Sequence, residues 1–205
     1  MRPFLLYVGP LLNLFSIGPY IIDVVRRKTK PNVVSWVTWT ILTSVGTAAV
    51  IAQENFIAGL LPLSSSLCTL SIVLLGFKYG FAKYSRFDVI CQAAALIGLA
   101  LWAIFNSPLI ALIAVITIDA IASMPTILHA YRAPQEETWQ TFGIGSLAAV
   151  LTLLSINSFT IGKLTYPVYL AIANGTIAVI IVVMRRKRGH SLSRNAVAGV
   201  LHENI

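Results

Sequence analysis

The most constraining feature of this sequence is a series of long apolar segments that carry few charges. An apolar segment of about 18 residues or more is typical of a transmembrane α-helix. Backbone groups in lipid have to be hydrogen-bonded within their own segment, so we expect helices throughout. The sequence contains seven such segments: Phe4–Val25, Val33–Ala52, Ile57–Phe77, Val89–Phe105, Leu109–Tyr131, Thr138–Ser155 and Tyr166–Met184.

The composition agrees with an all-α integral membrane protein. Of the 205 residues, 57% are hydrophobic and only 11% are charged, whereas a soluble domain carries roughly 25% charged residues. A chain with so few charges cannot cover a water-facing surface. We therefore expect a lipid bilayer around it, in a plasma or inner membrane.

The basic residues predict the orientation of the chain. The tail and the loops after the first, third and fifth segments hold 13 of the 15 lysines and arginines, and only Arg2 and Lys163 lie on the other side. Because cytoplasmic loops are rich in these residues, we expect the N-terminus outside and the C-terminus in the cytoplasm. The net charge of +8 comes from short, scattered loops, which favours contact with anionic lipid over nucleic acid.

An internal repeat divides the sequence into two related halves. The stretch from Pro19 to Trp39 and the stretch from Pro125 to Phe142 share an order of proline, basic residue, proline–amide pair, hydroxyl residue and tryptophan. The first copy has three extra residues in its loop. Matching positions are Pro19 with Pro125, Arg26 with Arg132, Pro31-Asn32 with Pro134-Gln135, and Trp36 with Trp139.

The repeat predicts an arrangement of three helices, one spacer helix and three helices. Because one spacer helix restores the direction of the chain, the two three-helix repeats are parallel and related by an axis along the membrane normal. We expect the first repeat in residues 1–80, the loop and spacer in 81–106, the second repeat in 107–184 and a basic cytoplasmic tail in 185–205.

This pattern resembles the PQ-loop repeat family, which includes the SWEET sugar transporters. The most specific part of the resemblance is the Pro134-Gln135 pair with a proline in the helix before it and a tryptophan after it; the first copy departs from it with Pro31-Asn32. The resemblance implies a carrier for a small solute such as a sugar or amino acid. Its path would run between the two repeats and open to each side alternately.

Asp119 is the strongest candidate for a functional side chain. It lies about ten residues from either end of its apolar segment, and a carboxylate in that position costs about 2.5–3.5 kcal/mol on insertion scales. One interpretation is a proton-coupling acid or a site for the amine of a substrate. The other is a structural Asp that holds helices together through hydrogen bonds.

Further polar residues on the same helices are candidates for substrate binding. In sugar-carrying relatives an asparagine on the third helix of a repeat contacts the solute, and Asn174 fits that position, with Thr69 as its counterpart. Aliphatic or small residues stand where those relatives place an aromatic, which argues against a sugar. A purely structural hydrogen-bonding role is the alternative for these residues. The candidates are Asn174, Asn13, Thr69, Ser66 and Ser123.

Prolines inside the apolar segments are candidate hinges, because proline removes a helical hydrogen bond. Asp23 and His129 occupy matching positions near the cytoplasmic mouth and could pair as an inner gate. We also expect Ser35 to cap the second segment, and Trp36 and Trp139 to lie at the headgroup level. The candidate hinges are Pro19, Pro62, Pro125 and Pro167.

The sequence lacks the patterns of an enzyme or of a cofactor protein. Cys68 and Cys91 have no paired spacing, so neither a disulfide nor a metal site is indicated, and we expect no cofactor. Two hypotheses follow. The chain is a carrier for a small polar solute, driven by its gradient or by protons, or it is a non-transporting receptor or assembly protein on the same scaffold. Both hypotheses allow a homo-oligomer.

Overall fold

The described part of the chain is all-helical, as the sequence predicts. The computed structural model describes residues 2–51, 56–104, 108–155 and 161–202, and within these ranges some side chains, Asn13 and Pro62 among them, lie outside the description. These ranges contain seven α-helices and one short 3₁₀ helix: α1 Arg2–Val25, α2 Val33–Ile51, α3 Phe56–Tyr79, α4 Arg86–Ile104, α5 Pro108–Arg132, η1 Pro134–Glu136, α6 Trp139–Ser155 and α7 Ile161–His202.

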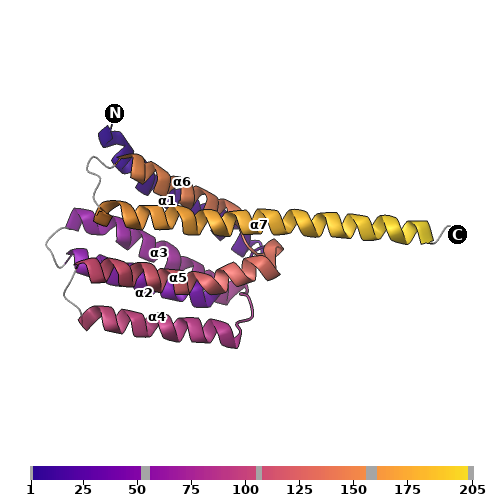
Figure 1. Cartoon of the computed structure of the whole chain (residues 1–205), viewed down its shortest axis with the longest axis horizontal. Coiled ribbons are helices and arrows are strands. Elements are labelled where there is room, and N and C mark those ends of the chain that lie inside the picture. The colour runs from indigo at the N-terminus through magenta and orange to yellow at the C-terminus, as the bar shows by residue number, and fades with distance from the viewer. Residues whose placement is uncertain (1, 52–55, 105–107, 156–160, 203–205) are drawn as a thin grey trace.

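The helices lie side by side along one common direction, and α7 extends beyond the bundle (Figure 1). The bounds of α1 to α6 agree closely with the apolar segments of the sequence. The seventh helix differs, because α7 is a continuous helix of 42 residues. The boundary expected at Met184, between the last membrane segment and a separate tail, therefore falls inside one helix.

Two of the described helices are long and apolar enough to cross a membrane. They contain the stretches Ile113–Arg132 in α5 and Leu164–Arg188 in α7, whose apolar windows are only 33% and 17% buried. The helical stretches Leu14–Val25, Val33–Val45, Ser65–Tyr79 and Trp139–Leu154 are apolar but shorter. Both long helices thus present most of their apolar surface outward, as a helix in lipid does.

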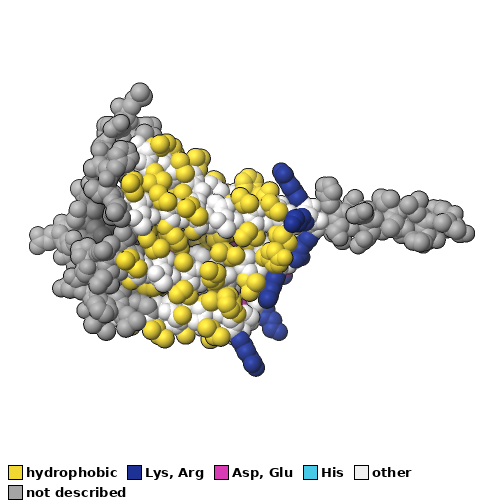
Figure 2. Space-filling model, viewed as in Figure 1, with side chains coloured by type: hydrophobic (Ala, Val, Ile, Leu, Met, Phe, Trp, Pro, Cys, Tyr) yellow, Lys and Arg dark blue, Asp and Glu magenta, His cyan; other side chains and the backbone are white. Residues whose placement is uncertain are grey.

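The surface is divided into an apolar flank and a basic end. Large side chains such as Phe15, Ile90 and Ile172 are 72%, 66% and 64% exposed. Hydrophobic atoms cover the flank of the bundle, and the described lysines and arginines gather at the end from which α7 extends (Figure 2). We call this end the basic end; it holds the end of α1, the end of α3, the start of α4 and the end of α5.

The contacts between helices fall into matching pairs. Helix α1 packs on α3 and α6, while α5 packs on α7 and α2. Helix α2 packs on α3, and α6 packs on α7. If α1, α2 and α3 are matched with α5, α6 and α7, every one of these contacts has its counterpart. Helix α4 packs on α5 and α2 and stands outside this scheme.

The core lies where α1, α2, α3, α5, α6 and α7 meet. Tyr20, Ile72 and Ile181 are completely buried, and Phe142 is almost so. Trp36 is only 3% exposed and packs on the Tyr20 ring with a centroid distance of 4.8 Å. Trp36 is therefore a core residue packed against Tyr20 and Trp39, whereas Trp139 is 40% exposed.

Candidate functional site

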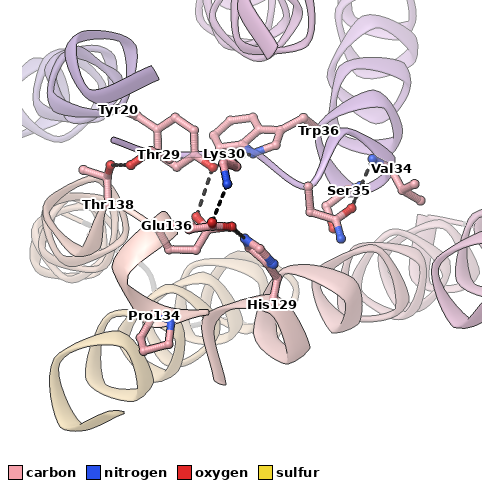
Figure 3. A network of polar contacts seen from close by, with 12 residues as sticks. Tyr20, Thr29, Lys30, Val34, Ser35, Trp36, His129, Pro134, Glu136 and Thr138 are labelled. Atoms are coloured by element: carbon pink, nitrogen blue, oxygen red, sulfur yellow. Dashed lines mark hydrogen bonds and ion pairs between the residues drawn. The ribbon is translucent and has the colours of Figure 1, made fainter. Parts of the chain in front are cut away.

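Polar contacts join the two halves at the basic end. The loop after α1 places the Thr29 hydroxyl 2.6 Å from the Thr138 hydroxyl, and both side chains are buried. The Thr138 hydroxyl lies 3.0 Å from Asp23 Oδ2. Lys30 forms an ion pair of 2.5 Å with Glu136, and its backbone N–H donates to the Glu136 carbonyl. Figure 3 shows Thr29 beside Thr138 and Lys30 facing Glu136 across this interface.

Glu137 lies at the centre of these contacts and is completely buried. Its Oε2 accepts a hydrogen bond of 3.0 Å from the Tyr20 hydroxyl, which in turn accepts one of 3.2 Å from the Trp36 indole. Tyr20 and Trp36 belong to the first half and Glu137 to the second. This chain of bonds therefore closes the interface between the halves at the basic end.

A second pair of atoms beside Glu137 is close but not bonded. Glu137 Oε1 and His129 Nε2 are both buried without a hydrogen-bond partner. They lie 3.9 Å apart, which exceeds the length of a hydrogen bond by almost 1 Å. His129 Nε2 also lies 3.7 Å from Glu136 Oε2. Unpaired polar atoms in a core are costly, so a small movement that joins them is favourable.

Burial also changes the acidity of Glu137. Removal of the carboxylate from water raises its pKa from an ordinary 4.5 to about 8, although the bond from Tyr20 and the charge of Arg185 oppose this. A carboxyl group with such a pKa gains or loses a proton near neutral pH. The cluster can therefore change its charge without any bound cofactor or metal.

Asp23 and His129 lie near the same network but have other partners than each other. Asp23 accepts from Thr138, and the carboxylates beside His129 are those of Glu136 and Glu137. Both predicted gate residues therefore lie in the network of polar contacts at the basic end, but they do not pair with each other. Sequence matching misses the acid between them, because Glu137 stands where the first half has Val34.

Asp119 lies deeper in the bundle and is 9% exposed. Its Oδ2 accepts a hydrogen bond of 2.6 Å from Tyr169 on α7. The Trp39 side chain on α2 is a further hydrogen-bonding neighbour of this carboxyl group. Ser123 donates to the Asp119 carbonyl within α5. Asp119 thus joins helices of both halves, and the sequence did not indicate Tyr169 as its partner.

The other predicted binding residues are distributed over separate contacts. Asn174 donates to the Leu170 carbonyl of its own helix and lies against Gly145 of α6. Thr69 donates to carbonyls of α3, and Ser66 bonds to Ser44 of α2 at 2.6 Å. Asn13 lies outside the described side chains. None of the described contacts brings Asn174 to Asp119.

The candidate hinge prolines lie within helices. Pro125 and Pro167 are inside α5 and α7, and Pro19 is inside α1. Pro62 falls within α3, where its side chain is outside the description. Each helix continues past its proline, and each proline removes one helical hydrogen bond at its position.

The two proline–amide pairs differ in their surroundings. Asn32 is buried, and its Oδ1 accepts from the backbone N–H groups of Val34 and Ser35 at 3.2 and 3.5 Å. Asn32 is therefore the N-cap of α2, and the expectation for Ser35 is wrong, because its hydroxyl donates to the Ala122 carbonyl of α5. Gln135 is exposed.

Tyr20, Glu137 and Arg185 are among the residues of this network at the basic end that the sequence did not single out as functional. Arg185 donates to the carbonyls of Pro134 and Glu137 at 2.8 and 2.5 Å. A signal for Glu137 exists in the repeat, since its counterpart is the apolar Val34 and such a position is expected to be partly buried. Comparisons of the chain with protein-family models, with curated proteins and with solved structures give no match.

Proposed function

We propose that the protein is a membrane carrier that moves a small polar solute by alternating access. In this proposal seven helices cross the membrane, α1–α3 and α5–α7 are two parallel repeats of the PQ-loop type, and α4 is the spacer. The paired helix contacts support the repeat. The basic end faces the cytoplasm of a plasma or inner membrane, because lysine and arginine concentrate there.

The observation that carries the proposal is the closure of the basic end by bonds between the two halves. Tyr20 with Glu137, Thr29 with Thr138 and Lys30 with Glu136 all cross this interface. A carrier needs contacts at one end that can break without unfolding the helices. Small polar contacts of this kind fit an inner gate, and the buried Asp119 lies deeper along the same interface.

Uptake into proteoliposomes tests the carrier function. The full chain would be reconstituted and offered a panel of sugars and amino acids, with and without a proton gradient. We expect saturable uptake of at least one solute, and at least a tenfold loss of proton-driven uptake in Asp119→Asn. Equal uptake by both proteins would remove the coupling role of Asp119, and no uptake over empty liposomes for any solute would remove the carrier function.

A disulfide across the inner gate tests alternating access. The variant Thr29→Cys/Thr138→Cys would be made in a Cys68→Ala/Cys91→Ala background, since the two hydroxyls are 2.6 Å apart. Oxidation should abolish uptake and reduction should restore it, whereas the two single-cysteine variants should be indifferent to oxidation. Full uptake with the disulfide formed would contradict a gate at this position.

One observation favours a second function, a non-transporting receptor or assembly scaffold. The side chains of Asp119 and Asn174 are bonded within the protein, to Tyr169 and to the Leu170 carbonyl. In this second function the polar residues hold the helices together. Asp119→Asn should then lower the thermal stability of the protein, and proteoliposomes with the native chain should take up no solute. The carrier reading predicts uptake by the native chain.

A further inference from the structure

Glu137 has one bonded and one unbonded oxygen, and the two face different halves of the protein. Oε2 is bonded to Tyr20 of α1 in the first half at 3.0 Å. Oε1 faces His129 of α5 in its own half at 3.9 Å, and neither of these two atoms has a partner. The carboxyl group can therefore stabilise either the contact between the halves or a contact within its own half.

The protonation state decides which contact is stronger. A carboxylate accepts hydrogen bonds, and its charge strengthens the bond from the Tyr20 hydroxyl about twofold over a neutral one. A protonated carboxyl group can instead donate a hydrogen bond to a ring nitrogen. His129 Nε2 is the nearby atom that can accept it. Protonation thus weakens the bond between the halves and creates one inside the second half.

The surroundings also provide a route for the proton. Glu136 is part-exposed, with 33% of its side chain accessible, and its Oε2 lies 3.7 Å from His129 Nε2. A proton from the water at the basic end can pass from Glu136 to His129 and on to Glu137. The other charged groups that act on the cluster are Lys30, which pairs with Glu136, Arg185 of α7 and Asp88 of α4.

We propose that the Glu137 carboxyl group is a proton-binding site, and that proton binding exchanges its bond to Tyr20 for a bond to His129 and so unlocks the inner gate. The proton moves from water to Oε1, which then donates to His129 Nε2, and no covalent bond changes apart from the one to this proton. The proposal rests on the carrier function, and it assigns proton control of the gate to Glu137 in addition to the role expected for Asp119.

Spin labels can follow the separation of the halves. Labels would be attached at Arg27→Cys and Gln135→Cys, two exposed positions in the loops of the two halves, in the Cys68→Ala/Cys91→Ala background. With native Glu137 the long-distance population should grow as the pH is lowered through about 8. In Glu137→Gln the long distances should dominate at every pH, because a neutral amide mimics the protonated acid. The same pH dependence in Glu137→Gln as in the native protein would overturn the proposal.

Two further measurements keep the test independent of one variant. Infrared titration should show a protonated-carboxyl band below about pH 8 that is missing in Glu137→Gln and kept in the matched control Glu136→Gln. Tyr20→Phe removes the bond between the halves but leaves the acid, so it should raise the long-distance population while a pH dependence remains. Loss of the band in Glu136→Gln, with the band kept in Glu137→Gln, would show that Glu136 binds the proton and would overturn the proposal.

The outcomes separate this proposal from the carrier function. If the label distances and the infrared band respond to pH as described while no solute crosses the membrane, the proton site stands and the carrier function fails. If a solute is transported and the Glu137 variants titrate like the native chain, the carrier function stands and the proton site fails.

Discussion

The two loops that connect α1 to α2 and α5 to α6 share a sequence pattern but make different contacts. The first loop, residues 26–32, leaves α1 through Arg27, whose φ of 57° is left-handed, and ends with Asn32 as the cap of α2. The second loop, residues 133–138, passes through the 3₁₀ helix η1 and has three residues fewer between the matched arginine and proline. Its amide, Gln135, is exposed, and its acids point to the interface.

One feature is common to both loops, a hydrogen bond accepted by the carbonyl of the matched proline. The Pro31 carbonyl accepts the Ala82 backbone N–H after α3, and the Pro134 carbonyl accepts the Arg185 side chain on α7. Both prolines are buried. The matched proline carbonyl therefore attaches the first loop to the backbone just after α3 and the second loop to a side chain within α7.

The acid in the second loop predicts the largest effect, a pH dependence of stability. The pKa of Glu137 is raised to about 8 in the folded protein, so the folded state binds a proton that the unfolded state releases above about 4.5. Its contribution is present at low pH and is lost as the pH rises through this window. We expect a loss on the order of 4 kcal/mol between pH 4 and 9.

Thermal unfolding in detergent from pH 4 to 9 checks this prediction. In Glu137→Gln the melting temperature should vary much less over this range, and above pH 8 the variant should be the more stable protein. Glu136→Gln, which changes a part-exposed acid in the same loop, should keep the native pH profile. A native profile that rises with pH would show that Glu137 is charged and well paired.

The attachment of the second loop by a side chain predicts the next effect. Arg185→Met removes two charge-assisted bonds and leaves the carbonyls of Pro134 and Glu137 unpaired, which costs about 3 kcal/mol. The melting temperature should fall by roughly 5–10 °C. The melting temperature of Arg185→Lys should lie between those of the native protein and Arg185→Met, since one ammonium group cannot reproduce the planar fork of the guanidinium group.

Arg186→Met is the matched control, because Arg186 is the exposed neighbour on the same helix. It should change stability by no more than about 0.5 kcal/mol. If Arg185→Met and Arg186→Met have the same melting temperature, the second loop does not depend on the Arg185 side chain. The proposed contrast between a backbone attachment in the first half and a side-chain attachment in the second would then be wrong.

The sequence predicts the helices better than the contacts between them. Apolar runs locate α1 to α6 because a long continuous apolar segment favours a helix whose backbone groups bond within the segment. They fail at the end of α7, where the basic residues after Met184 continue the helix. The contact of Tyr20 with Glu137 spans 117 positions of the chain, and a Glu-Glu pair in a polar turn is ordinarily solvated. The packing of α1 on α6 brings Tyr20 to Glu137, which is buried, while Glu136 stays part-exposed.

The two amides predict a smaller and more local difference. Asn32→Ala removes the cap of α2 and should destabilise the protein by about 1 kcal/mol. Gln135→Ala changes the matching residue of the second loop, which is exposed, and should stay within about 0.5 kcal/mol. Chemical unfolding of both variants measures the contrast. Equal losses would mean that the Pro-amide pairs have one shared function.

The smallest effect concerns the backbone of the first loop. Arg27 lies at the left-handed position after α1, where its N–H bonds to the Val24 carbonyl and the Lys28 N–H bonds to the Asp23 carbonyl. This is the geometry of a Schellman turn, which favours glycine. Arg27→Gly should therefore stabilise the fold by about 0.5–1 kcal/mol. In the second loop Ala133 has a negative φ of −135°, so Ala133→Gly should destabilise instead, and stabilisation by both would show that chain entropy, not this turn, governs the first loop.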